Sequence, residues 1–192
     1  MSHAIYQTQA VILERKGMRE SNLLLTLYTK RFGLIYVAVQ SGRKAESKMR
    51  PHLQRLSLVH VDLVEGREIW RLTGVHEHTS AMAILARPKA YAFLDRIMTN
   101  IKRLCRGEEA HTRLWQDIHN IYTCSMNTDE HLLPELEIAF LVRSLYALGY
   151  WNGQEAILQA KHPFSQDSLL ELRSLSSLLI PKINTSLQET QL

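Results

Sequence analysis

Residues 56–75 of the chain read LSLVHVDLVEGREIWRLTGV. The first nine are mostly leucine and valine, as expected of a strand, although polar residues alternate with them only imperfectly. Glu65, Gly66 and Arg67 form a short polar connection, after which a second apolar run extends from residue 69 to residue 75. This order predicts two antiparallel strands joined by a hairpin.

Three further strands are predicted upstream of this hairpin. They cover residues 5–13, 23–29 and 34–39. Residues 17–22 interrupt the chain after the first of these strands, Gly33 allows a tight turn before the third, and a polar loop follows at residues 40–52. Five short strands in fewer than 80 residues must close on themselves or leave exposed edges. We therefore predict a five-stranded OB-fold barrel, and an SH3-like barrel is the alternative that periodicity does not separate from it.

The apolar residues change to a helical period from residue 81 onward. One apolar stripe has spacings of three and four residues and comprises Ala90, Leu94, Ile97, Ile101 and Leu104. Pro88 suits the first turn of this helix. Later helices are predicted at about residues 110–125, 134–148 and 167–179, and Pro181 is expected to end the last of them.

These patterns predict an α+β chain with three parts. Residues 1–79 form the OB-fold domain, residues 80–180 form an all-α helical domain, and residues 181–192 form a flexible tail. A length of 192 residues suits one domain or two small ones.

Positive charge is concentrated in the first part of the chain. The whole sequence has a formal net charge of +4 at pH 7, whereas residues 1–80 alone hold 12 Lys and Arg against 7 Asp and Glu. Most of this excess lies between residues 30 and 55, where Glu46 is the sole acidic residue. A positive field confined to one small module is typical of phosphate binding, and a solvated loop that only aids solubility is the alternative.

Proteins that bind single strands combine a cationic groove with aromatic rings on which bases stack. We call the polar loop at residues 40–52 the basic loop. An aromatic residue near it is, taken alone, more often a core residue. Phe32 and Tyr36 are nevertheless the preferred stacking candidates, because they flank basic residues. The predicted nucleic-acid-binding residues are Lys30, Arg31, Phe32, Tyr36, Arg43, Lys44, Lys48, Arg50 and Arg55. Cations on a loop suit binding to phosphates of any sequence and do not suit base readout.

No catalytic site, metal site or cofactor is predicted. The sequence lacks both glycine-rich nucleotide-binding loops, a serine elbow and an H-E-x-x-H motif, so any work on DNA is expected to be independent of ATP. No common zinc-finger pattern has the spacing of Cys105, His111, His119 and Cys124. Buried cysteine is the preferred interpretation there. His76 and His78 lie two residues apart and are expected to face solvent.

The composition favours a cytosolic protein. Two cysteines cannot form a disulfide framework, which suits a reducing compartment. No apolar run approaches the roughly 18 residues of a membrane span. Residues 1–9 lack the basic start and apolar core of a signal peptide, so none is expected.

Several short motifs occur together in an order that is fairly specific as a set. They are AVIL (10–13), RESN (19–22), LTLYT (25–29), FGLI (32–35), SGRK (41–44), KMR (48–50) and WRLT (70–73). The set resembles the RecO family of bacterial recombination mediators. The helical part agrees more loosely, for example through LYALGY at residues 145–150, so the resemblance covers most of residues 4–150.

The resemblance implies an OB-fold, a helical domain and a DNA-repair function without catalysis. It implies binding to single-stranded and double-stranded DNA and annealing of complementary strands. It also implies that the protein, usually with the partner RecR, helps to exchange single-strand-binding protein for the RecA recombinase in the cytoplasm, at the nucleoid. In the family the acidic C-terminal tail of single-strand-binding protein docks on the helical domain. The basic candidates for that contact here are Arg96, Lys102, Arg103 and Arg143.

The sequence departs from the family pattern in three ways. Many members carry a four-cysteine zinc motif after the L-G-Y element, whereas residues 151–154 read WNGQ and no cysteine follows, so a zinc-free member is expected. The chain is short for the family, so a trimmed or rearranged C-terminal region is expected. Asn22 replaces the more usual aspartate. Two alternative functions remain at this point: an OB-fold RNA or tRNA binder, and a protein-interaction adaptor.

Overall fold

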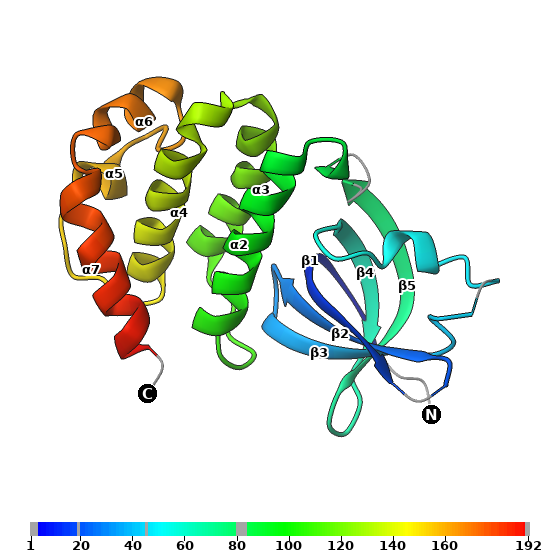
Figure 1. Ribbon diagram of the computed structural model, residues 1–192. Helices are drawn as coiled ribbons and strands as arrows, with labels where there is room; N and C mark the ends of the chain where they lie inside the picture. Colours follow the sequence, from blue (N-terminus) through cyan, green and yellow to red (C-terminus); the bar gives the residue numbers. More distant parts are fainter. Residues whose placement is uncertain (1–3, 19, 45, 80–83, 191–192) are drawn as a thin grey trace. The chain divides into compact units, whose positions relative to one another are not determined.

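A computed structural model describes residues 4–18, 20–44, 46–79 and 84–190, without the side chains of residues 77–79. The chain divides into two compact units. The first consists of Met1–Ala86 with Cys105–Ala110, and the second consists of Arg87–Leu104 with His111–Leu192. The strands lie in the first unit and the long helices in the second (Figure 1).

The strands of the first unit form a closed barrel in the order β1-β2-β3-β5-β4. Their bounds are Ile5–Met18 (β1), Asn22–Thr29 (β2), Gly33–Val39 (β3), Leu58–Val64 (β4) and Trp70–Thr79 (β5), and a 3-10 helix η1 lies at Arg50–His52. All neighbouring strands are antiparallel except β3 and β5, which pair in parallel at Val37 with Trp70 and at Ala38 with Arg71. This arrangement is that of an OB-fold, so the predicted fold class is confirmed.

β1 is longer than the sequence predicts. Its first half pairs with β4 and its second half with β2, and the register shifts between Ile12 and Glu14. A bulge of this kind bends a strand and increases its twist, which lets one strand serve two sides of a barrel. The prediction that the chain is interrupted from Gly17 is wrong, because Gly17 pairs with Leu23 and the strand continues to Met18.

Alternate side chains of the strands fill the barrel interior. The buried cluster contains Ala10, Ile12, Leu23, Leu25, Leu27, Ile35, Val37, Val39, Leu53, Val59, Val61, Leu63, Trp70 and Leu72. At the end of the barrel where β3 stops and β4 starts, Met49 and Leu53 pack against this core. At the end where β3 and β5 start, the core is covered by Tyr6 and Phe32.

The connection between α2 and α3 belongs to the barrel unit. Gly33 lies against it with a φ of +64°, and a Cβ at Gly33 would stand 2.0 Å from the carbonyl oxygen of Glu109. Glycine is therefore needed at Gly33 for two reasons, the left-handed backbone and the close approach of another main chain.

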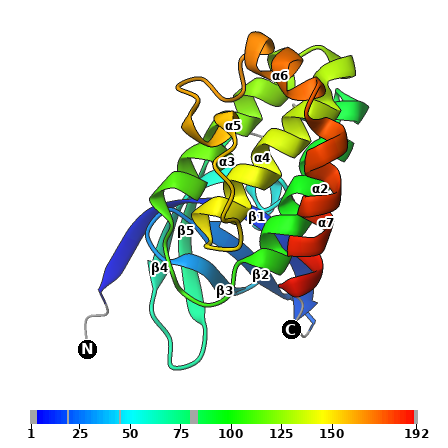
Figure 2. The ribbon, with the colours of Figure 1, turned by 90° about the vertical axis from the view of Figure 1, so that its left-hand side faces the viewer.

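The second unit is a helical bundle. Its elements are α2 (Pro88–Leu104), α3 (Thr112–Asn127), η2 (Glu130–Leu132), α4 (Leu133–Ala147), α5 (Ala156–Gln159), α6 (Gln166–Arg173) and α7 (Ser176–Glu189). The apolar helix α4 is central, because α2, α3, α5, α6 and α7 all contact it (Figure 2). α4 ends as the sequence predicts: Gly149 takes a φ of +79°, and the amides of Gly149 and Tyr150 donate to the carbonyls of Tyr146 and Leu145.

The prediction that Pro181 ends the last long helix is wrong. Pro181 lies inside α7, and the helix continues to Glu189, so most of the segment predicted to be a flexible tail is helical. A proline at this position removes one backbone donor from the helix. Leu179 and Ile183 are both buried, four residues apart on one face, and their packing outweighs that loss.

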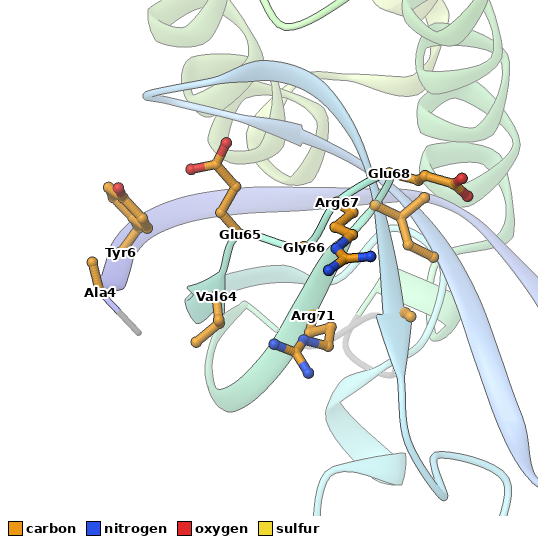
Figure 3. Close-up of a pocket in the computed structure, with 10 residues that line it drawn as sticks. Ala4, Tyr6, Val64, Glu65, Gly66, Arg67, Glu68 and Arg71 are labelled. Atoms are coloured by element: carbon orange, nitrogen blue, oxygen red, sulfur yellow. The ribbon is translucent and has the colours of Figure 1, made fainter. Parts of the chain in front are cut away.

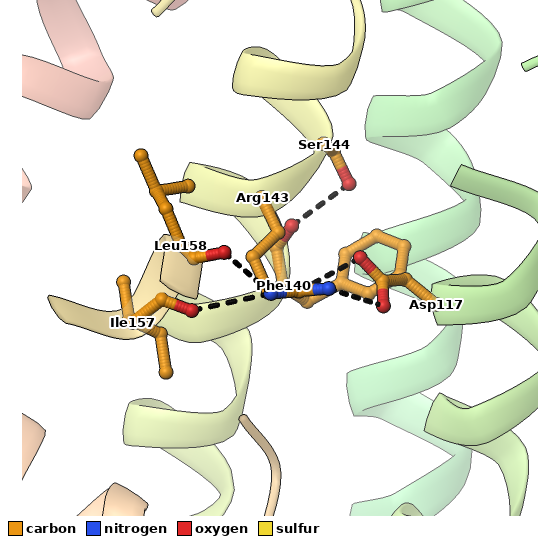
Figure 4. Close-up of polar contacts among 6 residues, drawn as sticks. All are labelled: Asp117, Phe140, Arg143, Ser144, Ile157 and Leu158. Atoms are coloured by element: carbon orange, nitrogen blue, oxygen red, sulfur yellow. Dashed lines mark hydrogen bonds and ion pairs between the residues drawn. The ribbon is translucent and has the colours of Figure 1, made fainter. Parts of the chain in front are cut away.

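An ion pair between α3 and α4 lies inside the bundle. Arg143 Nε donates to Asp117 Oδ2 at 2.8 Å and Arg143 Nη2 donates to Oδ1 at 3.1 Å. Its Nη1 donates to the carbonyls of Ile157 and Leu158, which ties α5 to α4 (Figure 4). Burial raises the pKa of the Asp117 carboxyl, and the hydrogen bonds from Arg143 act in the opposite direction.

Candidate nucleic-acid interface

Tyr36 projects from the outer face of the barrel. Its neighbours Ile35 and Val37 are buried in the interior, so alternation along β3 turns Tyr36 outward. It is 49% exposed, and its cross-strand partner on β2 is Thr26. An exposed aromatic ring in the middle of a strand is available to stack with a base.

A row of four cross-strand partners runs beside Tyr36. Lys16 of β1 pairs with Leu24 of β2, Leu24 pairs with Ala38 of β3, and Ala38 pairs with Arg71 of β5. Lys16 and Arg71 are exposed, so the two outer positions of the row are cationic and the inner two are small or apolar. Lys16 Nζ also lies 3.3 Å from Glu14 Oε2. We call these four residues together with Tyr36 the strand face.

A groove of about 920 Å³ adjoins the strand face at the connection between β4 and β5. Ala38, Val64 and Ile69 contribute apolar walls, while Tyr6 and Arg71 line it from β1 and β5. Figure 3 shows Arg67 and Arg71 on one side of this groove and Tyr6 on the other. The volume is within the ~300–1,000 Å³ range of ligand pockets, which is sufficient for a nucleobase with its sugar.

The groove carries no net charge of its own, because Glu65 and Glu68 line it together with Arg67 and Arg71. Its chemistry therefore suits a flat, partly polar group such as a base better than a phosphate. Contacts to phosphates would have to come from cations elsewhere on the barrel.

The cations predicted from the sequence lie at two opposite ends of β3. Lys30 and Arg31 occupy the turn where β2 ends and β3 begins, whereas Arg43, Lys44 and Lys48 follow the other end of β3. The seven residues of β3 separate the two groups by roughly 20 Å, at about 3.3 Å per residue. The structure thus does not gather these residues into one patch, and Tyr36 lies between the two groups.

Most of the predicted cations are exposed. The ion pairs among the residues that the structure describes do not include five of these cations: Lys30, Arg31, Lys44, Lys48 and Arg50. The Arg31 guanidinium lies 5.2 Å from the centre of the Phe32 ring and donates to the carbonyl of Gln7. Arg55 differs from the others because it is half-buried.

The connection between β3 and β4 is a series of tight turns. The amides of Lys44, Ser47 and Arg50 each donate to the carbonyl three residues earlier. The amide of Arg43 donates to the carbonyl of Ser21 at 2.9 Å, and the Arg43 side chain lies over Gly17. Hydrogen bonds therefore hold the basic loop against the β1–β2 hairpin.

The two preferred stacking candidates have different surroundings. Phe32 is half-buried and belongs to an aromatic cluster, with its ring centre 5.8 Å from that of Tyr6 and 4.8 Å from that of Trp70. Tyr28, which also lies near the basic loop in the sequence, is fully buried. Tyr36 is therefore the one ring of the predicted set that faces solvent to a large extent in the described structure.

The family described as "Recombination protein O N terminal" matches residues 1–80, which include all five strands. A "DNA repair protein RecO" of Dehalococcoides mccartyi (strain CBDB1) is 32% identical over 99 residues. Residues 1–80 of the chain therefore match the N-terminal domain of the RecO family. The predicted family is therefore confirmed.

The match to individual RecO proteins is partial. The alignment with the D. mccartyi protein covers 46% of this chain and 39% of that protein. A "DNA repair protein RecO" of Chlorobium phaeobacteroides (strain DSM 266 / SMG 266 / 2430) is 24% identical over 148 residues, or 76% of this chain and 56% of that protein. The chain thus matches 39% to 56% of the length of these relatives.

The structure changes the set of basic residues that lie at the surface of the helical unit. Arg143 is buried and bonded to Asp117, so it is not a surface contact as the sequence suggests. Arg96 forms a close ion pair with Glu137, at 2.7 Å between Nη2 and Oε2. Arg103 remains exposed near the end of α2.

Sequence reasoning missed Lys16, Arg67, Arg71 and Tyr6. The charges of the three cations entered the count for the N-terminal part, but all four residues are far from the basic loop along the chain. Arg71 is part of the WRLT motif of the RecO resemblance, which was the available signal. Placing it beside Ala38 required the register of β3 and β5.

The cysteines have the environments of structural residues. Cys105 is buried and Cys124 is half-buried, and burial raises the pKa of the Cys105 thiol to about 12. Within the described residues, no three or more His, Cys, Asp or Glu side chains are grouped so as to hold a metal ion. In that same part of the chain, no helix has the length and apolar character needed to cross a membrane. The side chain of His78 lies outside the described residues.

Proposed function

We propose that the chain is a DNA-repair and recombination mediator whose barrel binds single-stranded DNA across the strand face. Tyr36 is the observation that carries the proposal: it is an exposed ring on β3, and a group of exposed cations lies at each end of that strand. Backbone phosphates would contact the basic groups at the two ends of β3, and one base would stack on Tyr36. Double-stranded DNA would use the phosphate contacts alone.

This geometry suits annealing. Contacts to phosphates hold a strand without covering the base edges that pair with a complementary strand. A ring that stacks on one base does so whatever the sequence, because every base has a π-face. The proposal requires no ATP and no bond-making step, so the protein would act as a mediator and not as an enzyme.

The partners proposed for the chain follow from the RecO family. They are RecR, the acidic tail of single-strand-binding protein and, indirectly, the RecA recombinase, all acting in the cytoplasm. The exposed Arg103 is the available basic candidate for the acidic tail, together with Lys102 on the same helix.

Binding of a fluorescent single-stranded oligonucleotide to the full chain tests the proposal. Tyr36→Ala should weaken binding by roughly 5- to 150-fold, since stacking on one ring contributes ~1–3 kcal/mol, whereas Tyr36→Phe should retain it. Tyr150→Ala, which removes a ring that is 40% exposed in the helical bundle, is the matched control. Equal affinities of all three variants would contradict the proposal.

Two further measurements separate the proposal from the alternatives. Tighter binding to RNA than to DNA of equal length would support an RNA-binding protein instead. Absence of any salt-dependent binding would support a protein-interaction adaptor. Annealing of complementary strands, with and without a coat of single-strand-binding protein, would distinguish a mediator from a simple binder.

A further inference from the structure

Two histidines that are not part of the strand face lie opposite each other on β4 and β5. His60 of β4 and His76 of β5 are direct partners in the antiparallel register, although they are 16 positions apart in the sequence. Both side chains are exposed. His60 lies between the interior residues Val59 and Val61, so its side chain points out of the barrel.

The spacing of such a pair suits a metal ion. Directly opposed residues of an antiparallel pair have Cβ atoms about 4.5–5.5 Å apart. Two imidazoles on such positions can converge on one ion at the ~2.0–2.1 Å typical of zinc–nitrogen bonds. Metal chelation by sequence neighbours such as His76 and His78 is a different arrangement, because it would not join two strands.

The surroundings of the pair are polar. The side-chain amide of Gln9 on β1 lies 3.4 Å from His60 Nε2. A neutral imidazole has a lone pair on one ring nitrogen, and this is the form that binds a metal. Asp62, two residues along β4, accepts a hydrogen bond from Gln7 and lies over Gly74 on β5.

We propose that His60 and His76 form a binding site for a divalent late transition metal such as Zn²⁺. The ion would have two protein ligands and would keep water at its remaining positions, which makes the site open and exchangeable. Binding would link β4 to β5 through a loop of 15 intervening residues. A cross-link of this kind stabilises the folded barrel by restricting the unfolded chain.

Titration of the untagged full chain with Zn²⁺ by calorimetry tests the site. All samples carry His3→Gln, which removes a histidine outside the described residues. His60→Gln and His76→Gln should each weaken binding by roughly tenfold or more, because loss of even a supporting partner of a metal ligand costs about 10–100-fold. His131→Gln, an exposed histidine before α4, is the control and should leave the affinity unchanged.

NMR spectra of the same chain provide a second readout that needs no variant. Zn²⁺ should shift the ring resonances of His60 and His76 together, at one equivalent of metal. Equal zinc affinities of the chain and the two variants, or zinc-induced shifts confined to other histidines, would overturn the proposal. Neither result would bear on DNA binding by Tyr36, so the two proposals fail separately.

Discussion

The indole Nε1 of Trp70 donates a hydrogen bond to Oε1 of Glu108, at 3.0 Å. Trp70 is the first residue of β5, whereas Glu108 lies in the connection between α2 and α3, 38 residues later. The indole ring also packs against Tyr6 and Phe32, with ring centres 5.5 and 4.8 Å away. One end of the barrel is therefore closed by an aromatic cluster and by a segment that the sequence places between two helices.

Gly33→Ala should destabilise the chain much more than Gly107→Ala. Both glycines have positive φ, of 64° and 72°, but a Cβ at Gly33 meets the main chain of Glu109 whereas nothing lies within 4 Å of one at Gly107. The left-handed backbone alone costs ~1–2 kcal/mol, and the overlap with a carbonyl should bring the loss at Gly33 to ~3 kcal/mol or more. Urea denaturation measures both losses, and similar values would show that the connection does not pack against Gly33.

Replacing four cations of the basic loop by glutamine should flatten the salt dependence of DNA binding. These are Arg43, Lys44, Lys48 and Arg50. If all four contact phosphates, they contribute about −3 to the slope of log affinity for single strands against log salt, from ~0.7 per phosphate. Their loss should leave the shallower slope that Lys30 and Arg31 supply, and should abolish annealing. All four are exposed, so the thermal midpoint should change little.

The control for this experiment removes the same number of charges from the helical bundle. It replaces Lys89, Arg103, Lys161 and Lys182, which are all exposed. This variant should keep the slope of the unmodified chain. A slope that is unchanged in the loop variant, or reduced equally in both, would reject the basic loop as a phosphate-binding site.

The barrel could be predicted from the sequence because its strands are short apolar runs separated by clear turns. What the runs do not show is where a strand bends. In the sequence, Gly17 looks like the end of a strand. In the structure, Gly17 pairs with Leu23, so the strand continues beyond the bulge between Ile12 and Glu14. The prediction that a helix ends at Pro181 failed for a similar reason. Leu179 and Ile183 stabilise α7 through tertiary contacts, which the local sequence does not show.

The candidate site was only partly accessible to sequence reasoning. The run of cations from Lys30 to Arg55 was visible, but its separation into two groups depends on the direction of β3. Whether Phe32 or Tyr36 faces solvent depends on the aromatic cluster with Tyr6 and Trp70. Contacts between residues far apart in the sequence determine each of these points, so local patterns could not supply them.

Arg143→Met should destabilise the helical bundle strongly. The substitution leaves the Asp117 carboxylate buried without its cation, at a cost of ~3–5 kcal/mol. It also removes the donors to the carbonyls of Ile157 and Leu158. Replacing Asp117 by leucine in the same chain should recover part of the loss, because no charge is then left buried. Chemical denaturation of the single and double variants measures this, and a double variant less stable than the single one would contradict the argument.

The stabilisation from Glu155 should disappear in acid. Burial acts to raise the pKa of its carboxyl, but the hydrogen bond from Trp151 Nε1 and the neighbouring Lys182 lower the pKa below its ordinary value. A lowered folded-state pKa means that the stabilisation is complete above the unfolded value of ~4.3 and is lost as the pH falls through the folded value. The thermal midpoint of Glu155→Gln should therefore lie below that of the unmodified chain at pH 7.

The same comparison at low pH supplies the check. The difference in thermal midpoint between the two chains should shrink steadily once the pH falls below about 4.3. Glu171→Gln, at an exposed position of α6, is the control and should show a small difference at every pH. A difference between Glu155→Gln and the unmodified chain that persists at low pH would mean that the charge of Glu155 is not the source of stability.

Affinity for single strands should rise steeply with oligonucleotide length and then level off at about six to eight nucleotides. The two groups of cations are roughly 20 Å apart, set by the seven residues of β3. At ~3.4 Å per nucleotide in a stacked strand, this span takes about six nucleotides, and fewer if the strand is extended. Removing Lys30 and Arg31 should shift the levelling to shorter oligonucleotides, because one end of the track is lost. Anisotropy titrations with oligonucleotides of increasing length measure this, and a steep rise continuing past ~16 nucleotides, the upper end for one OB-fold, would show that the strand does not follow β3.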